Sequence, residues 1–220
     1  MKIGALFDWD GVIIDSSRFH EESWEQLARQ ENKTLPPGYF QNTLGKKNET
    51  IIPDILTWTH EEQEIKRIAA RKEEIYRRLI IDRGIAPLPG VQPFLTLLRE
   101  HHIPCGIGSS TPRLNILTAL DQLGLGTHFD VIIAAEDVSK GKPDPQVFLL
   151  AAQTLQEAPQ QCVVFEDAVA GIQAAKAGSM KAVAVTTSNP APRLREADMV
   201  VNRLDELSIA HLEELFSRPS

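Results

Sequence analysis

The sequence predicts an α/β fold: a Rossmann-like parallel sheet core with an inserted all-helical cap. Two observations indicate this. First, short apolar runs alternate with amphipathic segments after the insert, which is typical of βαβ units and a parallel sheet. Second, no strand pattern occurs between Asp15 and Ala86, where every periodic segment is helical. We therefore expect one core of residues 1–14 and 87–220, interrupted by a cap of residues 15–86.

The first strand ends in two carboxylates. The apolar run Ile3–Phe7 leads into Asp8, Trp9 and Asp10, and Gly11 then allows a sharp backbone turn. Residues two apart on a strand share a face, so both carboxylates converge on one small volume. Such a pair repels unless a cation lies between them or one carboxyl holds a proton. A divalent metal such as Mg²⁺ would relieve this repulsion. So would a division of roles in which one carboxylate is a nucleophile and the other holds a proton as an acid.

The cap segment is predicted to consist of helices joined by one loop. Residues 16–30 form an amphipathic helix, and residues 32–40, with the sequence Pro-Pro-Gly, form a loop. Residues 48–58 give a weak helix broken at Pro53, and residues 61–81 give a long amphipathic helix.

The remainder alternates between helix and strand. We expect strands at 103–108, 131–134, 162–165, 181–185 and 198–201. We expect helices at 91–101, 112–123, 144–155 and 168–177, with a last helix from Leu204. Because the carboxyl ends of parallel strands meet at one edge, polar residues at those ends should lie together.

Composition restricts the partners. The chain has 220 residues and a formal net charge of −7, which gives no reason to expect nucleic acid or an acidic membrane. No apolar run reaches membrane-spanning length, and no signal peptide precedes the first strand, so we expect a cytoplasmic protein. The expected oligomeric state is a monomer. Cys105 and Cys162 lie in apolar segments and are interpreted as buried hydrophobic residues.

Three further polar clusters follow predicted strands. Ser109 and Ser110 precede a helix that begins after Pro112, a place that suits either phosphate binding or simple helix capping. Lys142 precedes a proline and a helix, and is either aimed at the site or a solvated loop lysine. Glu166 and Asp167 are either metal ligands or helix caps. Together with Asp8 and Asp10, these residues supply the nucleophile, the phosphate-binding groups, the positive charge and the Mg²⁺ site that phosphoryl transfer requires.

These motifs resemble those of the haloacid dehalogenase superfamily of aspartate-nucleophile phosphotransferases. The resemblance rests on Asp8-Trp9-Asp10-Gly11, Ser109-Ser110, Lys142-Pro143 and Glu166-Asp167, in that order, and covers nearly the whole chain. Within the superfamily the chain is similar to the subgroup that contains β-phosphoglucomutase and its phosphatase relatives, which carry a helical cap after the first motif. The run from Phe7 to Ile13 and the cap residues His20 and Trp24 carry this closer similarity.

The resemblance implies a role for each motif. Asp8 would attack phosphorus and become an aspartyl-phosphate. Asp10 would protonate the leaving alcohol and then deprotonate the incoming water or hydroxyl. Ser109 and the Ser110 backbone would hold phosphate oxygens, and Lys142 would bridge Asp8 and the phosphate.

The resemblance also implies Mg²⁺ as cofactor. Its ligands would be Asp8, the Asp10 carbonyl oxygen, Asp167 and, in or near the coordination sphere, Glu166. The expected partner is a small phosphorylated metabolite.

Two differences between this chain and the family's motif pattern bear on the reaction that the resemblance implies. Phosphonate-cleaving relatives carry Trp at the place of Trp9 but lack an acid at the place of Asp10, so the sequence favours C–O–P over C–P cleavage. Mutase relatives carry a cap arginine where this chain has Asn48. Lys46 or Lys47 would have to replace that arginine. A lysine ammonium is a point charge and cannot make the two parallel hydrogen bonds that a guanidinium makes to a phosphate.

The sequence therefore predicts a Mg²⁺-dependent phosphatase of a small phosphomonoester, with a sugar phosphate as the favoured substrate. The alternatives are a β-phosphoglucomutase-type hexose-phosphate mutase and a non-catalytic binding protein on the same scaffold. The resemblance implies two further residues near the substrate. Arg113 would hold a distal phosphate, and His20 would either couple cap closure to Asp10 or be a histidine on the surface of its helix.

Overall fold

The computed structural model describes residues 2–43 and 46–217. The chain divides into two compact units, which are described separately. The α/β unit comprises Met1–Asp15 and Ala86–Ser220, and the helical unit comprises Ser16–Ile85.

The α/β unit is built on a six-stranded, all-parallel sheet in the order β3-β2-β1-β4-β5-β6. The strands are β1 Gly4–Phe7, β2 Cys105–Gly108, β3 Val131–Ile133, β4 Cys162–Glu166, β5 Lys181–Val185 and β6 Met199–Val201. The predicted α/β fold and its six strands are confirmed. In the central register, Phe7 lies opposite Ile107 of β2 and Phe165 of β4, so the residues that follow these strands share one edge.

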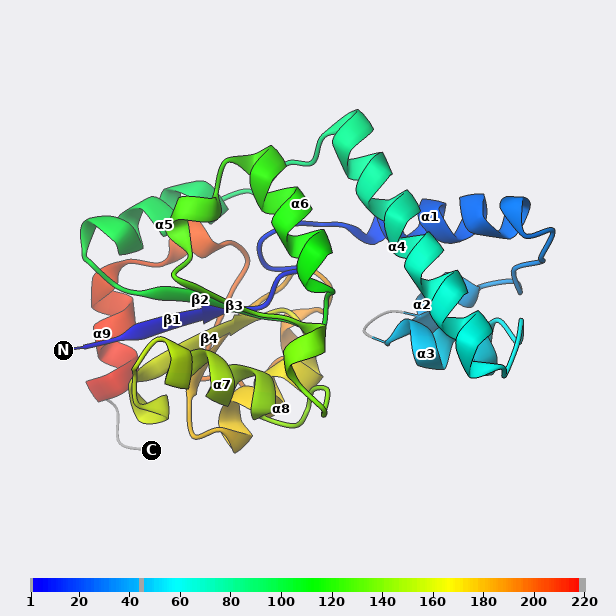
Figure 1. Ribbon diagram of the computed structural model, residues 1–220. Helices are drawn as coiled ribbons and strands as arrows, with labels where there is room; N and C mark the ends of the chain where they lie inside the picture. The colour runs from blue at the N-terminus through cyan, green and yellow to red at the C-terminus, as the bar shows by residue number, and fades with distance from the viewer. Residues whose placement is uncertain (1, 44–45, 218–220) are drawn as a thin grey trace. The chain divides into compact units, whose positions relative to one another are not determined.

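Helices cover both faces of this sheet, with α5 and α6 on one side and α7 and α8 on the other (Figure 1). Their bounds are α5 Val91–Glu100, α6 Arg113–Leu123, α7 Gln146–Thr154, α8 Val169–Ala177 and α9 Ile209–Ser217. The last helix was expected from Leu204, but Leu204–Glu206 form only a 3₁₀ turn and α9 begins at Ile209. The side chain of Ser208 caps this start, because its Oγ accepts the His211 N–H at 3.3 Å.

The helical unit contains no strand among its described residues, 16–43 and 46–85. Its elements are α1 Ser17–Gln30, α2 Tyr39–Thr43, α3 Asn48–Thr50, a π-helical turn Ile51–Ile55, and α4 Glu62–Arg83. Two predictions need correction. The predicted loop 32–40 ends early, because buried Tyr39 starts α2 and donates its hydroxyl to the Glu21 carbonyl at 3.2 Å. The weak helix does not break at Pro53; this residue lies inside the π-helical turn.

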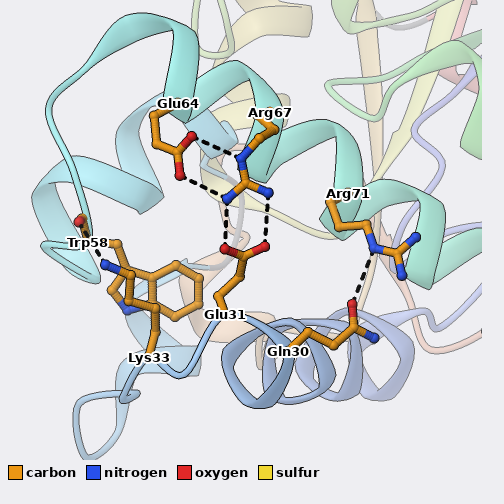
Figure 2. Close-up of polar contacts among 7 residues, drawn as sticks. All are labelled: Gln30, Glu31, Lys33, Trp58, Glu64, Arg67 and Arg71. Carbon is orange, nitrogen blue, oxygen red and sulfur yellow. Dashed lines mark hydrogen bonds and ion pairs between the residues drawn. The ribbon is translucent and has the colours of Figure 1, made fainter.

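Helices α1 and α4 pack together through an apolar core that includes Trp24 and Trp58, whose ring centroids lie 5.9 Å apart. Polar contacts tie the rim of this core (Figure 2). Arg67 on α4 donates to both carboxylate oxygens of Glu31, at 2.9 and 2.7 Å, and also binds Glu64. Because these side chains are partly exposed, such pairs contribute little stability, and burial of the apolar face holds the unit together.

Candidate active site

Lys142 lies between two carboxylates at the carboxyl edge of the sheet. Its Nζ is 2.9 Å from Asp8 Oδ1, just after β1, and 2.6 Å from Glu166 Oε1, at the end of β4. The side chain of Lys142 is only 10% exposed. Burial by itself would lower the pKa of Lys142, but the charges of Asp8 and Glu166 outweigh it and raise that pKa above its ordinary value. Lys142 is therefore a fixed ammonium beside Asp8.

Glu166 is fully buried, and both of its oxygens are engaged. Oε1 accepts from Lys142, while Oε2 accepts the N–H groups of Asp167 and Ala168, each at 2.9 Å. Burial raises the pKa of the Glu166 carboxyl, and the Lys142 charge opposes that rise. Glu166 thus orients Lys142 and fixes the turn that leads into α8.

The absence of a side chain at Gly171 makes room for Glu166. A Cβ added at Gly171 would lie 1.8 Å from Glu166 Oε1 and 1.9 Å from its Cδ. We expect Gly171→Ala to displace the carboxylate and to lower the free energy of unfolding by about 1–3 kcal/mol, the usual range for overpacking. Urea denaturation measures this. Gly126→Ala is the matched control, because a Cβ there has no atom within 4 Å, and equal midpoints for both variants would contradict the assignment.

Three carboxylates form a compact acidic cluster. Asp8, Glu166 and Asp167 each present an oxygen, and these oxygens lie within 4.8 Å of one another. Burial, followed by the nearby Asp8 charge, raises the pKa of Asp167. Gly11 has φ +81°, and a Cβ on it would lie 1.9 Å from Asp167 Oδ2, so the missing side chain leaves space for this carboxylate. Hard oxygen donors in such a cluster fit Mg²⁺.

The loop after β2 contains the second polar group of the site. The Ser109 N–H donates to the Ile133 carbonyl at 2.9 Å, and Ser109 Oγ accepts the Thr111 N–H at 3.2 Å. Thr111 Oγ1 in turn donates to Asp10 Oδ2 at 2.5 Å. Ser109 and Thr111 are buried, and the neighbouring Ser110 is half-buried. The edge therefore brings together Asp10, Ser109 and Thr111, of which Thr111 was not among the predicted site residues.

Arg113 is the first residue of α6 and lies beside this loop. Its guanidinium donates to the Ile132 carbonyl at 2.9 Å and pairs with Asp137, while its backbone N–H donates to Glu136. These contacts fix the start of α6. A role for Arg113 toward a distal phosphate stays a prediction.

Trp9, between the two aspartates, is fully buried. The backbone carbonyl of Trp9 accepts the N–H groups of Ile13 and Ile14, at 2.9 and 3.2 Å, and so forms the turn after β1. The indole is buried in the core of the α/β unit, and its Nε1 has no hydrogen-bond partner among the described residues.

One predicted residue of the helical unit, His20, contacts a buried lysine. His20 Nδ1 lies 2.6 Å from Lys72 Nζ, which also lies 3.0 Å from Glu73 Oε1. Asn48 donates to Glu73 at 2.8 Å. Burial, with the Lys72 charge next, lowers the pKa of His20 to about 3, so its ring is neutral at physiological pH.

Lys46 and Lys47 are exposed, whereas the buried cation of this unit is Lys72. Sequence reasoning missed Lys72 and Glu73. A signal was available, since both residues sit next to the apolar stripe of the long helix, but charges beside such a stripe are usually solvated.

Replacing Lys72 with Met tests the buried pair. The Lys72 side chain is 3% exposed and that of Glu73 is 10% exposed. Removing the ammonium takes a buried cation away from the Glu73 carboxylate, so we expect the unfolding free energy to fall by about 3–5 kcal/mol in urea denaturation. Lys66→Met on the same helix is the control, because Lys66 is exposed, and its midpoint should not move. Equal midpoints for both variants would show that the pair adds no stability.

The sheet order and the site at its carboxyl edge define a class of α/β enzymes that work on a ligand held beyond the strand ends. A family model, described as haloacid dehalogenase-like hydrolase, matches residues 4–178. The chain belongs to this family, which confirms the resemblance seen in the sequence.

Individual relatives narrow the class. The chain is 41% identical over 97% of its length to the chloroplastic 5-amino-6-(5-phospho-D-ribitylamino)uracil phosphatase of Arabidopsis thaliana, and it spans 57% of that longer protein. It is 32% identical to the validoxylamine A 7'-phosphate phosphatase of Streptomyces hygroscopicus subsp. limoneus, over 94% of this chain and 97% of that one. The structure of β-phosphoglucomutase from Clostridium difficile matches with a TM-score of 0.85 and 28% identity, covering 99% and 98% of the two chains.

These relatives confirm the prediction of an enzyme: the protein is a haloacid dehalogenase-like hydrolase of the phosphoric monoester type, and both phosphatases named above act on a phosphorylated small molecule. Among the described residues, no helix is both long and apolar enough to cross a bilayer. The cytoplasmic location and the monomeric state stay predictions.

Proposed function

We propose that the protein is a Mg²⁺-dependent phosphatase that hydrolyses a small sugar or polyol phosphate through an aspartyl-phosphate on Asp8. The observation that carries the proposal is the placement of Lys142 between Asp8 and Glu166, at 2.9 and 2.6 Å. An ammonium held there neutralises Asp8 enough for a phosphate dianion to approach, yet leaves a carboxylate oxygen to attack.

The steps follow from the groups around Asp8. The Asp8 oxygen forms a bond to phosphorus as the ester oxygen leaves, and Asp10 gives that oxygen a proton. Water then attacks phosphorus and gives a proton to Asp10 as the bond between the Asp8 oxygen and phosphorus breaks, and inorganic phosphate leaves. Ser109 and the Ser110 backbone hold the phosphate oxygens, and Lys142 offsets their charge.

A magnesium ion completes the site in this proposal. Asp8 and Asp167 would hold it with the Asp10 carbonyl oxygen, and Glu166 would lie in or near the coordination sphere. When bound, the cation offsets the negative charge of the transferring phosphoryl group.

The helical unit supplies substrate selection in this proposal, as a cap of residues 15–86 on a core of residues 1–14 and 87–220. Its candidates for substrate contact are His20, Lys46 and Lys47, with Arg113 on the core. The names of the two phosphatase relatives favour a phosphate carried on a polyol or a sugar-like ring.

A mutase is the second candidate, favoured by the match to β-phosphoglucomutase. A mutase must hold a second phosphate, and the mutase relatives carry an arginine where this chain has Asn48. Here Asn48 donates to Glu73 instead, which places a carboxylate next to that position. The Lys72 ammonium lies 3.0 Å from that carboxylate and offsets its charge, so the pair supplies no net positive charge, and neutral Asn48 supplies none either. The phosphatase is therefore the better assignment.

A substrate panel separates the two. Purified protein with Mg²⁺ is offered phosphorylated sugars, polyols and small metabolites, and phosphorus NMR follows both free phosphate and isomerised ester. We expect release of free phosphate without isomerisation. Conversion of β-glucose 1-phosphate to glucose 6-phosphate, stimulated by a bisphosphate, would establish the mutase instead. No turnover of any ester would leave a binding protein on this scaffold.

A further inference from the structure

Thr111 donates a hydrogen bond to the residue that the proposed mechanism uses as acid and base. Its Oγ1 lies 2.5 Å from Asp10 Oδ2, and the side chain is 7% exposed. The hydroxyl is the donor in this contact, because a threonine O–H donates while a carboxylate oxygen accepts.

The backbone of Thr111 is held on both sides. The Thr111 N–H donates to Ser109 Oγ at 3.2 Å, and the Thr111 carbonyl accepts the Ala135 N–H at 3.1 Å. Pro112 follows and restricts Thr111 to extended conformations. A β-branched side chain on a fixed backbone has few rotamers, so the hydroxyl stays directed at Asp10.

We propose that Thr111 is a positioning residue that fixes which oxygen of Asp10 carries the transferred proton. This inference rests on the proposed function. A hydroxyl that donates to Oδ2 disfavours a proton there, so the acid form of Asp10 carries its proton on Oδ1. The proton then passes from Oδ1 to the leaving oxygen as the P–O bond breaks, and Oδ1 takes a proton from water in the second half-reaction.

The leaving group provides the test. An alkyl alcohol needs a proton as it leaves, whereas p-nitrophenolate leaves without one. The value of kcat/KM covers the steps up to cleavage of the ester, so it isolates this proton transfer from later hydrolysis. The measurement compares the alkyl phosphate ranked first in the substrate panel with p-nitrophenyl phosphate, for wild type, Thr111→Val and Thr111→Ser.

For Thr111→Val we expect kcat/KM to fall about 100-fold on the alkyl ester and less than about threefold on the aryl ester. Thr111→Ser keeps the donor and should stay within about tenfold of wild type on both. Thr118→Val, on the neighbouring helix, is the control for removing a threonine hydroxyl, because Thr118 bonds only to the Leu114 carbonyl of its own helix.

Two results would overturn the proposal. An equal loss on both esters would mean that Thr111 acts on the phosphate or on Ser109, and no loss on either would mean that it does not position Asp10. Far-ultraviolet circular dichroism and a thermal melt check that the variants are folded. Failure of the proposed function has a different signature, since wild type would then hydrolyse neither ester, or Asp8→Asn would be as active as wild type.

Discussion

Replacing Asp8 with Asn should reduce phosphatase turnover by at least about 10⁴-fold while the protein stays folded. The amide keeps the size of the side chain but cannot attack phosphorus. The fold of the protein should tolerate the change. The substitution removes one of three neighbouring carboxylates and so relieves repulsion in the cluster of Asp8, Glu166 and Asp167. Release of phosphate from the best ester in the panel measures the loss, and a thermal melt measures the fold.

The control is Asp121→Asn, which removes an exposed carboxylate from α6 and should leave turnover unchanged. A second measurement reports the intermediate itself. Acid quenching of wild type during turnover, followed by mass spectrometry, should find phosphate on the peptide that contains Asp8. Retained turnover in Asp8→Asn, or phosphate on another residue, would contradict the nucleophile assignment.

The carboxyl edge of the sheet was predictable because parallel strands impose it. Once β1, β2 and β4 are recognised as parallel neighbours, the residues after Phe7, Gly108 and Glu166 must meet at one edge. The apolar strand pattern is local and strong, so the fold class and all six strands follow from the sequence. The lysine was harder to predict, since Lys142 reaches the same place from a loop after β3.

The role of Glu166 could not be decided from its position. At the sequence level a metal ligand and a helix cap were equally good interpretations of the Glu166-Asp167 pair. In the structure Glu166 does not cap α8: one oxygen accepts the N–H groups of Asp167 and Ala168, which precede the helix, and the other pairs with Lys142. That ion pair joins residues 24 positions apart, so no local sequence pattern predicts it.

Thr111 and Lys72 escaped prediction for a related reason. A threonine before a proline usually marks the start of a helix, and a lysine on an amphipathic helix usually faces solvent. Their importance comes from partners distant in the chain: Asp10 lies 101 positions from Thr111, and His20 lies 52 positions from Lys72. Only tertiary structure reveals such pairs.

Removing magnesium should abolish turnover and also change how stability depends on pH. The acidic cluster contains three carboxylates, and the ammonium of Lys142, which pairs with Asp8 and Glu166, offsets only part of their negative charge. Chelation with EDTA should therefore leave a site that repels the phosphate dianion, and added Mg²⁺ should restore activity. In the proposed site the cation binds only the folded state, so the melting temperature should rise with Mg²⁺ concentration. Asp167→Asn should weaken this rise, whereas Asp121→Asn should not.

The pH dependence follows from the direction of two pKa shifts. In the metal-free protein, burial raises the pKa of Glu166 and of Asp167 above the ordinary carboxyl value of about 4. The folded state then binds more protons than the unfolded state above that value, so stability falls as the pH rises toward neutrality. A bound divalent cation keeps both carboxylates ionised and should flatten this slope. Urea denaturation at several pH values, with EDTA or with Mg²⁺, measures the difference, and identical slopes would mean that the cluster binds no cation.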